Sequence, residues 1–284
     1  MGKSLKDIIE TITGLAVDRM SAMGGGCVSD VYKVGLSDGT SLVAKAGDTG
    51  SGLELEGSML GYLADHTQLP VPDVIHCADT LLLMTLLPSG GSLNGAAQVH
   101  AADLVAALHD ISADNFGFDI DTVIGGLHQP NRQSGSWLEF FARYRLIEMA
   151  RQGLDAGRLP GAMMKRVEAF ADQLDRWLKE PQRPSLIHGD MWGGNVLAAD
   201  GRITGFIDPA IYFADPEIEL AFTTLFSTYD DAFFSRYREH RPIQPGFFEE
   251  RRDLYNLYPL LVHVRLFGGS YVASVDGILR KFGF

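Results

Sequence analysis

Cysteine and positive charge are scarce in this sequence. Its 284 residues include two cysteines, Cys27 and Cys77, which form no spaced pair of the kind that a zinc site or a small disulfide framework needs. We therefore expect a reducing compartment. Lys and Arg number 24 against 36 Asp and Glu, a formal net charge of -12, which argues against a broad nucleic-acid-binding surface. Any anionic ligand has to meet positive charge that is concentrated locally.

A long uncharged apolar run is also missing. No stretch of about 18 such residues occurs, so we expect no membrane span. Residues 5–12 place Leu and Ile at helical spacing, but Asp7 and Glu10 interrupt the apolar core that a signal peptide would need. Hydrophobic residues make up 46% of the chain, which is ample material for a buried core. We expect a globular, cytoplasmic protein.

The first third of the chain has the pattern of an antiparallel sheet. Three short strands are predicted within residues 17–46, the last two joined by a turn at Asp38-Gly39. A helix is then predicted at 53–64, with strands near 74–76 and 81–87. The last of these strands is apolar enough to be central and buried.

Beyond residues 88–91 the hydrophobic period changes to 3.6, which is typical of helices. We predict helices at 99–109, 137–154, 162–178, 216–226 and 247–267, and short strands at 186–188, 196–198 and 203–207. We place a lobe boundary at the Pro and Gly residues of 88–91. A small β-rich lobe, 1–88, and a larger helical lobe, 89–284, would leave a cleft between them, where small-molecule sites usually lie.

The most informative motif is HGDMWGGN at residues 188–195, followed by IDP at 207–209. Phosphoryl transfer needs a carboxylate within reach of the attacking hydroxyl and hard oxygen ligands for Mg²⁺. Asp190 would be the catalytic base, with Asn195 and Asp208 as metal ligands, as in the catalytic loop of protein kinases. The plainer interpretation is a capped turn and a strand end.

A glycine-rich segment, GGGCV, lies between two predicted strands. This context excludes a dinucleotide-binding fingerprint, which opens a helix. Glycines at a hairpin tip let backbone N–H groups approach phosphates at little steric cost. We predict that this loop covers the phosphates of ATP, with a plain turn as the alternative; its residues are Gly24, Gly25, Gly26, Cys27 and Val28.

Lys45 ends the run VAK on the next predicted strand, where a kinase keeps the lysine that reaches the α- and β-phosphates. The following helix offers Glu54 and Glu56 as ion-pair partners. We prefer Glu56, because Leu60 and Leu63 follow it at helical spacing and mark the buried stripe. Glu54 is the alternative partner, and an exposed strand lysine is the alternative role.

The segment MTLL at residues 84–87 precedes the predicted lobe boundary. Met84 and Leu86 would line an adenine pocket through backbone groups and apolar side chains. A plain core strand is the alternative.

Four segments together resemble the fructosamine kinases, a branch of the aminoglycoside and choline phosphotransferase superfamily: HGDMWGGN, IDPAIYFADPEIELA, FGFDIDTVIGGLHQPN and LVHVRLFGGSY. The likeness spans nearly the whole chain. HGD with a downstream Asp belongs to the superfamily at large, whereas Trp192, IGGLHQPN and FGGSY point to this branch. The resemblance implies an α+β, protein-kinase-like bilobal fold, with a small antiparallel β-sheet N-terminal lobe with one helix and a larger, mainly helical C-terminal lobe.

The resemblance also implies phosphorylation of a ketosamine, small-molecule or protein-bound, by ATP and Mg²⁺ at the hydroxyl of its third sugar carbon. The phosphorylated adduct would then release its amine, which amounts to repair of glycated molecules. Asp190 would be the base, Asn195 and Asp208 would hold Mg²⁺, and Lys45 with Glu56 would belong to the nucleotide site.

The resemblance is less specific about the acceptor. Trp192 would pack on the sugar, although a Trp is more often a packing residue. His263 would contact the substrate or pack its helix, and Asp215 and Glu219 would bond the catalytic loop or be solvated. The 84–87 segment lacks the acidic residue expected between the lobes, so the choice between ATP and GTP stays open.

Two other functions compete with this interpretation. The first keeps the chemistry and changes the acceptor to another hydroxylated amine of the aminoglycoside or choline type. The second is a nucleotide-binding scaffold without catalysis, which would not need Lys45, Asp190, Asn195 and Asp208 together.

Overall fold

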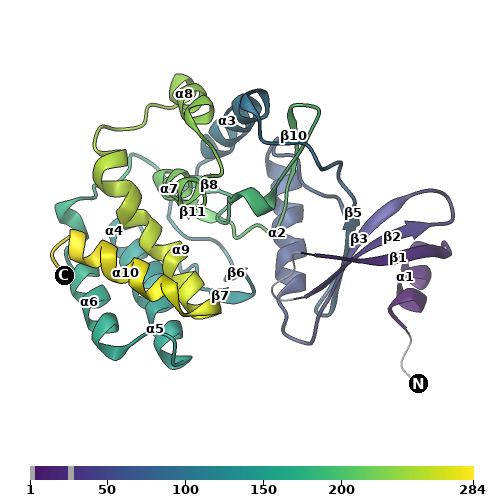
Figure 1. The fold of residues 1–284 in the computed structure, drawn as a ribbon, viewed down its shortest axis with the longest axis horizontal. Coiled ribbons are helices and arrows are strands. Elements are labelled where there is room, and N and C mark those ends of the chain that lie inside the picture. Colours follow the sequence, from purple (N-terminus) through teal and green to yellow (C-terminus); the bar gives the residue numbers. More distant parts are fainter. Residues whose placement is uncertain (1–3, 25–28) are drawn as a thin grey trace.

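The computed structural model describes residues 4–24 and 29–284. These residues form two lobes (Figure 1). The N-terminal lobe contains a sheet, and the other lobe, which contains most of the remaining chain, is mainly helical. No helix in this described part of the chain is long and apolar enough to cross a membrane.

The N-terminal lobe contains one five-stranded antiparallel sheet of order β1-β2-β3-β5-β4. Its strands are β1 (Val17–Met23), β2 (Asp30–Leu36), β3 (Ser41–Ala46), β4 (Val74–Ala78) and β5 (Leu81–Thr85). All five predicted strands are confirmed. The apolar strand β5 lies inside the sheet, between β3 and β4, as its composition predicted.

The two faces of this sheet carry different helices. Helix α1 (Leu5–Thr13) packs on one face, where Leu42 and Ala44 of β3 share a buried cluster with Ile9. Helix α2 (Leu53–His66) packs on the other face, against Val43. Because successive side chains of a strand point to opposite faces, Lys45 lies on the α2 face together with Val43.

The C-terminal lobe is mainly helical. Its helices are α3 (Gly95–His109), α4 (Trp137–Phe140), α5 (Glu148–Asp155), α6 (Gly161–Ala171), α7 (Glu217–Leu225), α8 (Asp231–His240), α9 (Arg252–Phe267) and α10 (Ser270–Lys281). A π-helical segment, Phe141–Ile147, joins α4 to α5, and another, Phe247–Arg251, leads into α9. Short 3₁₀ turns occur at Leu174–Arg176 and Gly193–Asn195.

Three two-stranded sheets complete this lobe: β6 (Thr122–Ile124) with β7 (Leu127–Gln129), β8 (Ser185–Ile187) with β11 (Tyr212–Ala214), and β9 (Val196–Ala199) with β10 (Arg202–Phe206). Strands β8, β9 and β10 confirm the predicted ones. Strands β6, β7 and β11 and helices α8 and α10 were not predicted.

One predicted helix, 162–178, was too long. Helix α6 ends at Ala171, and Gln173 leaves the helical region with φ -125°. The break lets the chain turn so that Leu174 and Leu178 are both 2% exposed.

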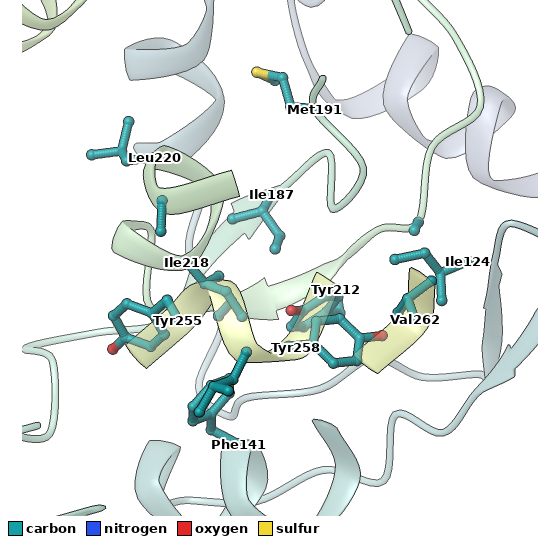
Figure 2. Packing of buried hydrophobic residues seen from close by; sticks show 14 of the residues in the cluster. Ile124, Phe141, Ile187, Met191, Tyr212, Ile218, Leu220, Tyr255, Tyr258 and Val262 are labelled. Atoms are coloured by element: carbon teal, nitrogen blue, oxygen red, sulfur yellow. The ribbon is translucent and has the colours of Figure 1, made fainter. Parts of the chain in front are cut away.

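The core of the C-terminal lobe surrounds α9. Figure 2 shows Tyr255, Tyr258 and Val262 of this helix among side chains from β8, β11 and α7. Ile187 at the end of β8 and Met191, four residues later, are both buried in this cluster. The segment between them is therefore anchored to the core at both ends.

Candidate active site

The segment after β8 makes a tight turn that requires glycine. Gly189 has φ +85°, and a Cβ built on it would lie 2.0 Å from the carbonyl oxygen of Ala210. The Ala210 amide donates to the His188 carbonyl at 2.8 Å, which keeps the two segments together. The turn carries Asp190 out of the core and next to the segment that follows β10.

We expect Gly189→Ala to destabilise the protein. The left-handed backbone and the contact with Ala210 together cost about 2 kcal/mol or more, equivalent to a fall in Tm of about 4 °C or more. Gly157→Ala is the matched control, because Gly157 has φ +69° and open space around its Cα. Thermal unfolding measures both variants, and equal losses would contradict the close approach at Gly189.

Asp190 and Asn195 contact each other across residues 188–195, the predicted catalytic loop. The Asn195 side-chain amide donates to the Asp190 carbonyl oxygen at 2.9 Å and to Asp190 Oδ2 at 3.0 Å. These bonds turn Asn195 Oδ1 away from Asp190. Burial, and then the charge of Asp208, raise the pKa of Asp190 to about 7.

Asp208 follows β10 and has φ 55°, a left-handed conformation that Asp tolerates better than most residues. Its carboxylate accepts a hydrogen bond from the Lys45 ammonium, which also donates to Glu56 Oε1 at 2.7 Å. Lys45 is 6% exposed. Burial alone would lower the pKa of Lys45, but the charges of Glu56 and Asp208 outweigh it and raise that pKa, so the ammonium stays charged.

The structure thus brings together residues from both lobes. We call Lys45, Glu56, Asp190, Asn195 and Asp208 the transfer site. Glu54, the alternative partner for Lys45, is exposed, and the Lys45 ammonium pairs with Glu56 instead.

The transfer site has the donor chemistry that Mg²⁺ uses. Asp208 offers a carboxylate and Asn195 a neutral oxygen whose direction is fixed by the bonds of its amide nitrogen. No cluster of three or more His, Cys, Asp or Glu side chains that could hold a metal occurs within residues 4–24 and 29–284. One carboxylate and one amide fit Mg²⁺, which is commonly held by few protein ligands together with nucleotide phosphates.

The predicted phosphate loop connects β1 to β2. Gly24 is an exposed residue just after β1. Gly25, Gly26, Cys27 and Val28 lie outside the residues that the structure describes.

The two predicted adenine contacts belong to, or pack against, the apolar cluster between the sheet and α2. Met84 is 3% exposed and belongs to the cluster between the sheet and α2, on the same face as Lys45. Leu86 is half-buried and packs against this cluster from beyond the end of β5. Their contact with adenine stays a prediction.

The two predicted acceptor residues share an aromatic neighbour that the sequence analysis missed. The Trp192 ring meets Phe226 edge-on with centroids 5.8 Å apart, and Phe226 lies 5.1 Å from the His263 ring. No motif or helical spacing singles out Phe226 in the sequence, because it follows the last turn of α7. A large apolar residue just after that helix was the only available sign.

Glu219 supports the catalytic loop. Its Oε1 accepts the Gly189 amide at 2.7 Å, while Oε2 lies 2.9 Å from His109 Nε2. Glu219 and His109 are both buried, so the loop is fixed by a buried carboxylate. Asp215 does not take this role, because its Oδ2 accepts the Tyr255 hydroxyl at 2.8 Å.

The family-like stretch IGGLHQPN, residues 124–131, supports the segment that follows Asp208. Gln129 Nε2 donates to the Ala210 carbonyl at 3.1 Å, and Gln129 Oε1 accepts the Tyr258 hydroxyl at 2.6 Å. Asn131 Oδ1 accepts from the fully buried guanidinium of Arg145 at 2.6 Å. This buried polar network holds the backbone two residues after Asp208.

The buried carboxyl of Asp215 predicts a pH dependence of stability. Burial, and then the charge of Glu217, raise its pKa from 3.8 to about 7. Between these values the native state binds more protons than the unfolded state, so stability falls as the pH rises. We expect Tm to fall less between pH 5 and pH 8 in Asp215→Asn than in the wild type. Parallel pH profiles of Tm would contradict this assignment.

A separate cavity of about 950 Å³ lies next to the start of α7, between residues 177–183 and 237–245. Several of its charged residues form ion pairs, for example Arg241 with Asp110 and Arg251 with Glu217. It contains no residue of the transfer site.

The two lobes have the fold of the protein-kinase-like phosphotransferases. An aminoglycoside phosphotransferase solved with ADP and hygromycin B has this fold, with a TM-score of 0.69 at 18% identity, covering 99% of this chain and 100% of that one. A Thermobifida fusca protein provisionally designated a fructosamine-3-kinase gives a TM-score of 0.86 at 33% identity, covering 98% of this chain and 99% of that one.

Sequence comparison gives the family. The sequence model of the fructosamine kinases matches residues 1–282. A Vibrio parahaemolyticus protein with the provisional designation ketoamine kinase is 32% identical over 238 residues, which cover 80% of this chain and 79% of that one. A chloroplastic protein-ribulosamine 3-kinase of Oryza sativa subsp. indica is 28% identical over 275 residues, covering 93% and 78%.

The chain belongs to the fructosamine kinase family. It is an ATP-dependent phosphotransferase whose acceptor is a hydroxyl group.

Proposed function

We propose that this protein phosphorylates a sugar hydroxyl of ketosamines, with ATP as the donor and Mg²⁺ as the cofactor. The observation that carries the proposal is the contact of Lys45, from the sheet, with Asp208, which lies beside the catalytic loop. This contact joins the lysine of one lobe to the carboxylates of the other in one site. The designations of the relatives, ketoamine kinase and ribulosamine 3-kinase, support the choice of acceptor.

On the donor side, Lys45 would bind the α- and β-phosphates, with Glu56 fixing its ammonium. Residues 24–28 would cover the phosphates, and Met84 and Leu86 would contact the adenine. Asn195 Oδ1 and the Asp208 carboxylate would hold Mg²⁺, which neutralises charge on the phosphates when it is bound.

On the acceptor side, Asp190 takes the proton of the attacking hydroxyl. The hydroxyl oxygen forms a bond to the γ-phosphorus, the bond from that phosphorus to the β–γ bridging oxygen breaks, and ADP leaves. The Asn195 amide holds the Asp190 carboxylate in position for this proton transfer. Trp192 would pack on the sugar, with His263 near the amine.

We propose the third sugar carbon as the site of phosphorylation and release of the amine as its consequence, a deglycation repair. Residues 1–88 would form the nucleotide-binding lobe and 89–284 the lobe with the catalytic loop and the acceptor site. The low cysteine content supports a cytoplasmic setting.

An ATP-consumption screen tests the acceptor class. It compares fructosamines, ribulosamines, aminoglycosides and choline at equal concentration, with Asp190→Asn as the blank. We expect turnover with the ketosamines only. Turnover with choline or an aminoglycoside alone would overturn the proposal, and turnover in no case would leave the scaffold interpretation.

A further inference from the structure

A row of aromatic rings leads away from the catalytic loop. It starts with Trp192 and Phe226 and continues over the end of α9 to the start of α10. The His263 ring lies 5.7 Å from that of Phe267 and 4.8 Å from that of Tyr271, centroid to centroid. We call these five residues the aromatic row.

The aromatic row is open to solvent. Trp192 is 40% exposed, Phe226 38% and Phe267 53%. Large hydrophobic side chains that are exposed singly are normal, but exposed rings in contact with one another mark a binding surface. The row touches the catalytic loop at Trp192, so a molecule bound along it extends from the transfer site.

The first ring requires a glycine beside it. The Trp192 indole lies over Gly194, where a Cβ would be 2.4 Å from the far edge of the indole. No other residue at position 194 leaves room for this ring. The row therefore begins at a defined point two residues from Asp190.

His263 gives the row a hydrogen-bond acceptor. Its Nδ1 lies 2.7 Å from the Pro259 carbonyl oxygen, which can only accept, so Nδ1 carries the proton. Burial lowers the pKa of His263, which favours the neutral ring. Nε2 then presents a lone pair, and no hydrogen bond from the described part of the chain reaches it.

We infer that the aromatic row beyond Trp192 binds the amine side of the ketosamine and selects substrates in which a protonated secondary amine carries an apolar group. This inference rests on the proposed function. Ring faces attract a cation, and an ammonium N–H is the donor that His263 Nε2 needs. Beyond the amine, Phe267 and Tyr271 offer apolar surface to the group attached to the amine.

The test uses fructose adducts of methylamine, butylamine and phenylethylamine. Their Kd values are measured by calorimetry and their kcat/KM values by ATP consumption. We expect the phenylethylamine adduct to exceed the methylamine adduct by about tenfold in both affinity and kcat/KM. A 1-O-phenylethyl fructose, in which an ether oxygen replaces the amine, should bind about tenfold more weakly than its amine counterpart.

Substitutions in the aromatic row test which rings produce the preference for phenylethylamine. Phe267→Ala and Phe226→Leu should reduce the tenfold preference for phenylethylamine to below about threefold. Phe267 is the most exposed ring of the row, so its removal should leave Tm within about 2 °C. Ile75→Ala is the matched control, because Ile75 is 46% exposed on β4, in the other lobe, and should keep the full preference.

The outcomes separate the inference from the proposed function. Equal Kd values across the amine series, or an unchanged preference in Phe267→Ala and Phe226→Leu, would overturn the inference even if every adduct is phosphorylated. The expected order of Kd values without any turnover would uphold the inference and overturn the proposed function.

Discussion

Asp190→Asn should lower kcat by about 10³-fold, because an amide of the same shape cannot take the proton of the attacking hydroxyl. The fold should persist, since the Asn195 amide also bonds the Asp190 backbone carbonyl, at 2.9 Å, and this bond does not depend on the side chain. Steady-state ATP consumption with a ketosamine measures the loss. The Kd for ATP, measured by calorimetry, should change by less than about threefold.

Asp200→Asn is the matched control for this change. Asp200 is an exposed carboxylate in the same lobe with φ 50°, a conformation that Asn adopts readily. Its variant should retain kcat within about twofold. If Asp190→Asn keeps more than a tenth of the wild-type kcat, Asp190 is not the base.

Asp208→Asn should lower kcat by at least about 100-fold and raise the Mg²⁺ concentration for half-maximal rate by about tenfold. The substitution removes the negative charge but retains an oxygen. Asn is preferred to Ala here because Asp208 has φ 55°, and Asn tolerates this backbone with little added strain. A magnesium titration at fixed ATP tests the expectation.

The loss of activity in Asp208→Asn has a second explanation that must be excluded. Asp208 also pairs with Lys45, so its loss leaves that ammonium with Glu56 alone. Lys45→Met tests this contribution, since it should weaken ATP binding without a change in the Mg²⁺ midpoint. A normal midpoint in Asp208→Asn would show that Asp208 does not hold the metal.

Elements with a strong local pattern were predictable from the sequence. The apolar run of β3 and the hairpin turn at Asp38-Gly39 depend on neighbouring residues, and both are present. Helix α10 was missed because Gly269 precedes it directly and Gly277 lies within it, so the segment looked irregular. Strands β6, β7 and β11 have three residues each, too few for an alternation to be recognised.

Part of the transfer site was predictable for the same reason. Asp190 and Asn195 lie in one loop, where the spacing of the motif sets their separation. The contact between Lys45 and Asp208 joins residues 163 positions apart, and only the packing of the lobes creates it. Both residues were predicted to belong to one site because their motifs are typical of kinases. Local spacing did not predict their contact.

The supporting residues were the hardest to anticipate. Glu219 was considered together with Asp215, and only the structure shows that Glu219 faces Gly189 whereas Asp215 faces Tyr255. Asp215 lies two residues before α7, whereas Glu219 lies in the first turn of that helix, so the direction of one side chain does not follow from that of the other. Helical spacing alone does not fix that direction.

Phosphorus NMR of the product is the most direct test of the central claim. The protein is incubated with ATP, Mg²⁺ and a fructosamine, and the new phosphate signal is correlated with the sugar protons. The account predicts a phosphate coupled to the proton on the third carbon, formed in equal amount with ADP and absent with Asp190→Asn. Formation of ADP with free phosphate and no phosphorylated sugar would contradict it.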